Sequence, residues 1–171
     1  MLSTWLNCCS ENALRLLIIG VVFLTQLMQL TQPASAQVPP GAEEISRYSG
    51  LHAAAQQGNL AQVSSLIAAG NDINARDAYG RTPLHVATFA RQREAIRALI
   101  AAGARTDLLE HDRYDAVTIA AVADDEETLR ALVEAGANTQ LADRSGATPL
   151  ALAKARDYTA MVEILQKAGA R

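Results

Sequence analysis

The chain has 171 residues, of which half are apolar and only 4% are aromatic, so a single folded domain is expected. The apolar residues are mostly Ala and Leu, which suits closely packed short helices better than a β-sandwich. The formal net charge of −3 gives no reason to expect nucleic acid or an anionic membrane as a partner.

Residues 1–36 have the features of a secretory signal peptide. Arg15 precedes an apolar run from Leu16 to Leu30, and Ala34-Ser35-Ala36 follows it. A basic flank, a short apolar stretch and an A-x-A sequence predict cleavage between Ala36 and Gln37. We therefore expect a periplasmic or secreted protein. An uncleaved membrane anchor is the alternative, although the run is shorter than the roughly 20 residues of a membrane span.

Cleavage at this point would leave a chain without cysteine. Cys8 and Cys9 both precede the apolar run, so the mature protein would depend on its core alone for stability. Residues 37–43 are expected to be a flexible linker, because Pro39-Pro40-Gly41 continues neither a helix nor a strand. The folded domain is expected from residue 44 to residue 171.

A period of 33 residues organises the rest of the chain. Glycines recur at this spacing, and three rows of apolar residues precede them. The rows are Gly70, Gly103, Gly136 and Gly169; Leu66, Leu99, Leu132 and Leu165; Val63, Ile96, Leu129 and Val162; and Ala54, Ala87, Ala120 and Ala153. Such a period predicts stacked units, at about 44–76, 77–109, 110–142 and 143–171. A stack without one central core favours binding over catalysis.

Each unit is expected to be a helix–turn–helix, which makes the fold all-α. In the second unit Thr82 is a good N-cap, and Pro83 suits the first helical position because its missing N–H costs nothing there. A second helix carries Ile96 and Leu99 on one face, and Gly103 ends it in the left-handed conformation.

These residues resemble the ankyrin repeat family. The resemblance rests on T-P-L-H-V-A at 82–87, T-P-L-A-L-A at 148–153, G-L-H-A-A-A-Q-Q-G-N at 50–59 and the helix ends such as A-A-G-N-D-I-N at 68–74. It implies a solenoid of about four repeats, with short β-hairpin fingers joining the units. In that family the finger tips and the short inner helices form a concave surface that binds other proteins.

Four residues depart from the repeat pattern. Arg47 replaces the finger glycine in the first unit, which we expect to be a partial cap. The third unit is the most divergent, with Arg113 at the glycine position and Asp115 starting the helix. We expect Asp115 to cap that helix. Gln166 replaces an apolar residue in the fourth unit, as a solubilising end requires.

Polar clusters give no reason to expect a catalytic or metal site. His52 and His85 occupy the same repeat position, so they should lie one repeat apart, about 10 Å. This is too far to share one metal ion, whose ligands lie near 2 Å from it. Each histidine is instead expected to hydrogen-bond the backbone of an adjoining finger. The acidic run 124–127 is expected to cap a helix, with a patch for a basic partner as the functional alternative. No catalytic motif is present after the leader, so we expect neither an enzyme nor a cofactor.

The positions that vary between units form the candidate partner surface. By register with the family, these residues are Tyr79, Arg81, Phe89, His111, Asp112, Tyr114 and Arg144, types rich in binding hot spots. We expect a monomeric, exported protein-binding module with an inhibitory, immunity-type or accessory role. The alternative is a structural scaffold tethered by an uncleaved leader.

Overall fold

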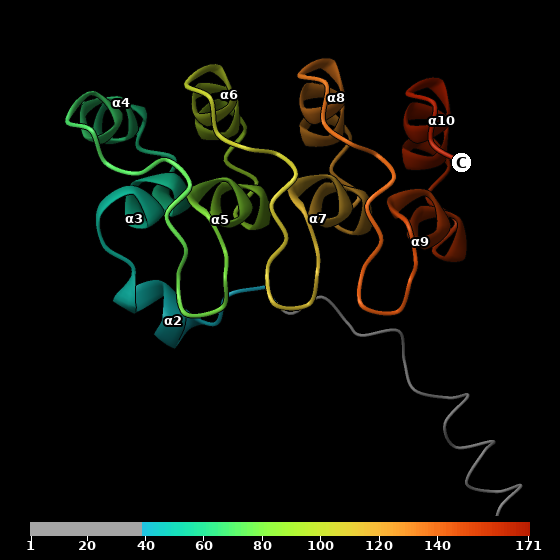
Figure 1. The fold of residues 1–171 in the computed structure, drawn as a ribbon, viewed down its shortest axis with the longest axis horizontal. Helices are drawn as coiled ribbons and strands as arrows, with labels where there is room; N and C mark the ends of the chain where they lie inside the picture. Colours follow the sequence, from blue (N-terminus) through green and yellow to red (C-terminus); the bar gives the residue numbers. More distant parts are fainter. Residues whose placement is uncertain (1–38) are drawn as a thin grey trace, which may run out of the picture. The chain divides into compact units, whose positions relative to one another are not determined.

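The computed structural model describes residues 39–171, so the predicted cleavage point at Ala36 and Gln37 lies outside the described residues. Its helices are α2 (Ala42–Arg47), α3 (Gly50–Gln57), α4 (Leu60–Ala68), α5 (Pro83–Phe89), α6 (Arg93–Ala101), α7 (Ala116–Val122), α8 (Glu126–Glu134), α9 (Pro149–Ala155) and α10 (Thr159–Lys167). The inner helices α3, α5, α7 and α9 pack side by side in one row, and the outer helices α4, α6, α8 and α10 form a second row (Figure 1). The all-α solenoid is confirmed.

Side-chain caps start the inner helices α5, α7 and α9, as the sequence predicts. Thr82 and Thr148 accept hydrogen bonds from backbone N–H groups three residues on, and proline follows each of them. Asp115 does the same for α7, where its Oδ1 lies 2.8 Å from the Thr118 nitrogen. The divergent third unit therefore keeps its helix, because a carboxylate replaces the hydroxyl as the hydrogen-bond acceptor.

The core lies between the two rows of helices. All four alanines at 54, 87, 120 and 153 are fully buried, where a larger side chain would hold neighbouring helices apart. Ile96, Leu99 and Leu129 are also fully buried. Gln166 is exposed, in agreement with its expected role on the end of the stack.

Hairpin turns join the helix pairs and project from the inner helices (Figure 1). We call these turns the first finger (77–81), the second finger (110–114) and the third finger (143–147). In each finger the first residue's N–H donates to the last residue's carbonyl, at 2.9, 3.0 and 3.0 Å. Residues 39–171 contain no β-strand, so the expected β-hairpins are tight turns without extended strands.

A carboxylate at the start of each finger holds its turn together. Asp77 Oδ1 accepts from the backbone nitrogens of residues 79 and 81, both at 2.8 Å. Glu110 Oε1 and Asp143 Oδ1 accept from the corresponding nitrogens of their own fingers at 2.8 to 3.1 Å. These bonds satisfy backbone groups that the missing strands leave unpaired.

Three positions in each of the second, third and fourth units adopt left-handed backbone. One is the glycine after the outer helix, at 103, 136 and 169, with φ of 91°, 77° and 83°. In the fingers they are Gly80, Arg113 and Gly146, with φ of 75°, 64° and 85°. In the turn between the inner and outer helix they are Gly58, Arg91, Asp124 and Asp157, with φ between 53° and 67°. Glycine adopts this conformation at little cost, whereas other residues are strained in it.

Helix α2 precedes the first helix pair and begins at Ala42, inside the segment 37–43 expected as a linker. The Glu44 side chain accepts a hydrogen bond from the Gly41 nitrogen at 3.0 Å, which closes the first turn. The first unit therefore carries a short helix where later units carry a finger.

Candidate protein-interaction surface

Hydrogen bonds connect neighbouring fingers into one ridge, which we call the finger ridge (77–81, 110–114 and 143–147). The His111 nitrogen donates to the Tyr79 carbonyl at 3.0 Å, and the Arg144 nitrogen donates to the Asp112 carbonyl at 3.3 Å. Arg76 adds a side-chain bridge, with its Nη1 donating to the Leu109 carbonyl at 2.8 Å. These contacts fix the spacing between finger tips, so the ridge is a preorganised surface.

The two histidines bond the backbone in or just before the adjoining finger, as expected. His52 Nε2 lies 3.1 Å from the Arg81 carbonyl, and His85 Nε2 lies 3.0 Å from the Leu108 carbonyl. Burial lowers the pKa of His85 to about 4, so its ring is neutral at pH 7. Among residues 39–171 no three His, Cys, Asp or Glu side chains are close enough to hold a metal ion.

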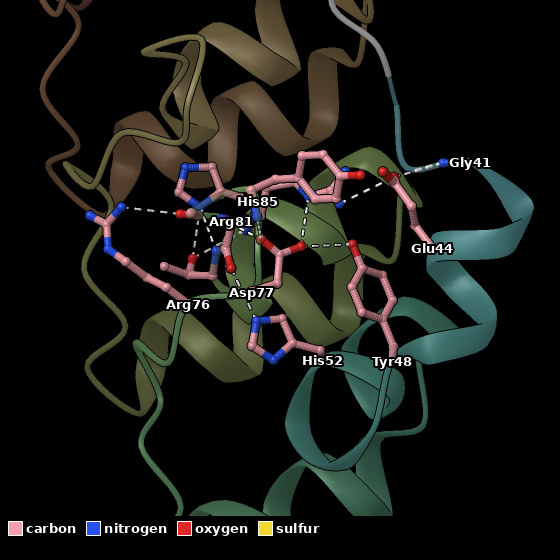
Figure 2. A network of polar contacts seen from close by, with 11 residues as sticks. Gly41, Glu44, Tyr48, His52, Arg76, Asp77, Arg81 and His85 are labelled. Atoms are coloured by element: carbon pink, nitrogen blue, oxygen red, sulfur yellow. Dashed lines mark hydrogen bonds and ion pairs between the residues drawn. The ribbon is translucent and has the colours of Figure 1, made fainter.

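Arg81 lies in an internal ion-pair network rather than at an exposed finger tip (Figure 2). Its side chain is 5% exposed, with Nε 2.8 Å from Asp77 Oδ2 and Nη2 3.2 Å from Glu44 Oε2. The Tyr48 hydroxyl also donates to Asp77 Oδ2, at 3.2 Å. The prediction that Arg81 is open to a partner is therefore wrong, because α2 and the first finger's own aspartate enclose it.

Electrostatics favour this ionised network. Although burial opposes it, the pKa of Asp77 lies below its usual value because the Arg81 backbone and guanidinium donate hydrogen bonds to the carboxylate. The pKa of Glu44 is lowered by hydrogen bonding with the Tyr79 side chain, and further by Gly41 and Arg81. The network joins α2 to the first finger across a sequence separation of 37 residues.

Tyr79 covers this network and remains open to solvent. The Arg81 guanidinium carbon lies 4.4 Å from the centre of the Tyr79 ring, a favourable cation–π distance. The Tyr79 residue is 45% exposed, and its ring meets the His111 ring edge-on at 6.3 Å. Tyr79 and His111 therefore form one aromatic contact across two finger tips.

A second apolar cluster lies between the fingers and the inner helices. Tyr114, Ile119 and Leu152 are buried in it, and the half-buried Phe89 and Val122 pack against them. Ala147 of the third finger also contacts the cluster. The prediction that Tyr114 is exposed is wrong, since only 3% of the residue is accessible.

The structure thus divides the predicted partner residues into two groups. Tyr79, His111 and Arg144 are exposed on the finger ridge, with Asp112 and Phe89 partly exposed beside them. Arg81 and Tyr114 are buried. Sequence reasoning did not name Arg113 as a surface cation, and the break in the glycine row at 113 was the available signal.

The acidic run 124–127 acts at the start of α8, as expected. Asp125 caps the helix by accepting from the Thr128 nitrogen, and Glu126 and Glu127 lie in the first turn. Glu127 pairs with Arg93 of the preceding outer helix at 2.6 Å. These carboxylates therefore stabilise the helix start and connect two units.

Two family models match this sequence. One, described as ankyrin repeats in many copies, matches residues 51–100, and the other, described as ankyrin repeats in three copies, matches residues 94–171. The chain belongs to the ankyrin repeat family. The comparison with curated proteins returns no match.

Membership in the ankyrin repeat family indicates a protein–protein interaction module, and nothing in it indicates enzymatic activity. Within residues 39–171 no helix is long and apolar enough to cross a membrane.

Proposed function

We propose that this ankyrin repeat protein is exported and binds a partner protein through its finger ridge and the adjoining ends of the inner helices. The hydrogen-bonded ridge carries the proposal, because it holds Tyr79, His111 and Arg144 on consecutive fingers at fixed spacing. A rigid surface binds with less loss of conformational entropy than a flexible one. Inhibition, immunity-type blocking and an accessory role are all compatible with such binding.

Site-specific photo-cross-linking in the native cell tests the surface. A photoreactive amino acid replaces His111 or Arg144 on the ridge, and Arg97 or Lys167 on the outer helices serves as the control. We expect one partner band from each ridge position and none from the control positions. Adducts of equal yield from both sets would show that the ridge is not the binding surface.

N-terminal sequencing of the same cross-linked sample tests export. A mature chain that starts at Gln37 in the extracytoplasmic fraction supports the proposal. A chain that retains Met1 and sediments with membranes supports the tethered scaffold instead.

A further inference from the structure

The most exposed charged side chains of the second and third fingers are positive. Arg113 and Arg144 are exposed, and Arg113 takes part in none of the ion pairs within residues 39–171. The only ion pair of Arg144 in that part of the chain is to Asp112, at 3.7 Å with both side chains open to solvent. The Arg144 guanidinium also donates to the His111 carbonyl of the second finger. Because these contacts are exposed and contribute little stability, a partner carboxylate can still pair with the guanidinium.

The carboxylates of these fingers are engaged within their own turns. Glu110 Oε1 accepts two backbone hydrogen bonds, at 2.9 and 3.1 Å. Asp143 is only 7% exposed, and its Oδ1 also accepts from two backbone nitrogens. The positive side chains therefore face solvent while most of the negative ones face the backbone.

A patch of apolar side chains, which we call the apolar floor (Phe89 and Val122), adjoins these cations. Phe89 and Val122 occupy the same register position in successive units and are half-buried, whereas the first unit has Gln56 there. Arg156 lies at the same floor, with its Nη1 3.3 Å from the Leu152 carbonyl and its charge acting on Tyr114. The floor therefore has a basic group on the helix side as well as on the finger side.

The first finger lacks this combination. The guanidinium of Arg81 is buried between Asp77 and Glu44, so the positive charge of the first finger is already neutralised by these carboxylates. The whole chain is acidic, with a net charge of −3, so positive charge at the second and third fingers is a local feature. Charge complementarity at such a surface selects partners and accelerates encounter.

We propose that the second and third fingers, with the ends of α5, α7 and α9, bind an acidic segment of a partner protein that also carries an apolar anchor. This inference rests on the proposed function and narrows it to one class of partner. Carboxylates of the segment pair with Arg113, Arg144 and Arg156. Its apolar side chain packs on Phe89 and Val122, which a nucleic acid backbone would leave unused.

Selection from a randomised dodecapeptide display library tests the partner class. We expect the selected peptides to be rich in Asp and Glu and to share an apolar residue. Binding of a fluorescein-labelled selected peptide should weaken by about tenfold or more in the Arg113→Glu/Arg144→Glu variant, and more at low than at high salt. Phe89→Ala should weaken it without changing the salt dependence.

The matched control is Arg97→Glu/Lys167→Glu, which changes the net charge equally on the exposed outer helices. This control should bind the peptide as the unmodified chain does. Peptides that are neutral or basic, or that bind the two double variants equally, would overturn the inference. Tighter binding of labelled oligo(dT) than of the peptide would do so in favour of nucleic acid.

These outcomes are separable from failure of the proposed function. If cross-linking from His111 finds a partner but the selected peptides are not acidic, only the partner class is wrong. If cross-linking gives no ridge-specific partner, the proposed function itself fails.

Discussion

The first and second fingers share one backbone and differ in almost all their chemistry. Both close a turn of the same length, and both hold it with a carboxylate at the first position. The first finger uses Gly80, buries Arg81 and is joined to α2, whereas the second exposes Arg113 and buries Tyr114. The turn geometry therefore depends on backbone hydrogen bonds, so the other side chains can stabilise the fold in the first finger and remain exposed in the second.

Among substitutions that test this comparison, Arg81→Ala should have the largest effect on stability. The substitution leaves Asp77 and Glu44 without their buried cation, which should lower the free energy of unfolding by about 3–5 kcal/mol. Urea denaturation measures the change. The control is Arg144→Ala on the third finger, whose side chain is 68% exposed and whose loss should cost little. Equal costs for the two variants would mean that burial of Arg81 does not distinguish the fingers.

Asp115→Thr tests the cost of the carboxylate cap of α7, which directly follows the second finger. Burial raises the pKa of Asp115 from 3.8 to about 6, against hydrogen bonds from Thr118, and its Oδ2 has no hydrogen-bond partner among residues 39–171. The folded state thus binds the Asp115 proton more tightly than the unfolded state does. The protonated carboxyl group therefore favours folding at low pH, and this contribution to stability is lost as the pH rises through about 6. Near neutral pH and above, the variant should be more stable by about 3 kcal/mol, from two pKa units at about 1.4 kcal/mol each.

This gain should disappear when both states are protonated. Urea denaturation near pH 3.5 should give similar free energies of unfolding for the variant and the unmodified chain, because 3.5 lies below about 3.8. Asp112→Thr, at a partly exposed position of the second finger, is the control and should change stability by under about 0.5 kcal/mol. A gain of the same size at every pH would contradict the charge-based explanation.

His85, which bonds the second finger's stem, should give the opposite pH dependence. Its pKa falls from 6.5 to about 4 on folding because burial penalises the charged ring. Stability is therefore fully present above about 6.5 and is lost as the pH falls towards 4, by up to about 3 kcal/mol. In the unmodified chain protonation of Asp115 offsets this loss, so Asp115→Thr should be clearly more sensitive to acid. NMR titration of the His85 ring checks the cause, and a midpoint near 6.5 would refute it.

The smallest effect should follow from Arg113→Gly in the second finger. Arg113 has φ of 64°, so glycine relieves strain of about 1–2 kcal/mol while the unfolded chain gains entropy. We expect a net stabilisation of about 0.5 kcal/mol by thermal unfolding. Gly80→Ala in the first finger should destabilise instead, since its Cβ would also lie 3.3 Å from Arg76 and His111 atoms. A change in stability of the same sign for both variants would show that the two fingers do not differ in backbone strain.

Local features of this fold were predictable from sequence, and long-range ones were not. The caps at Thr82 and Asp115 depend on residues three positions away, so the local sequence is sufficient to predict them. The histidine contacts followed from the repeat register. Burial of Arg81 depends on Glu44 in a helix that has no counterpart in later units, so the period contained no information about it.

Burial of Tyr114 shows a second limit of the repeat register. The register places residue 114 on a finger, and variable finger positions are expected to be exposed. Its ring instead fills the space beside Leu152 and Phe89, which are larger than the Ala53 and Gln56 of the first unit. Side chains from two neighbouring units determine the burial, and a pattern read one position at a time does not combine them.

The turn between the inner and outer helix has a consequence for how the repeat is recognised. Residues 58, 91, 124 and 157 are a glycine, an arginine and two aspartates, yet all four have φ between 53° and 67°. Comparison by residue identity matches only the two aspartates, whereas comparison by the backbone torsion angle φ matches all four positions. The four units share a bend in the chain rather than an amino acid, so substitution by glycine at 91, 124 and 157 offers three independent sites for engineering a more regular array.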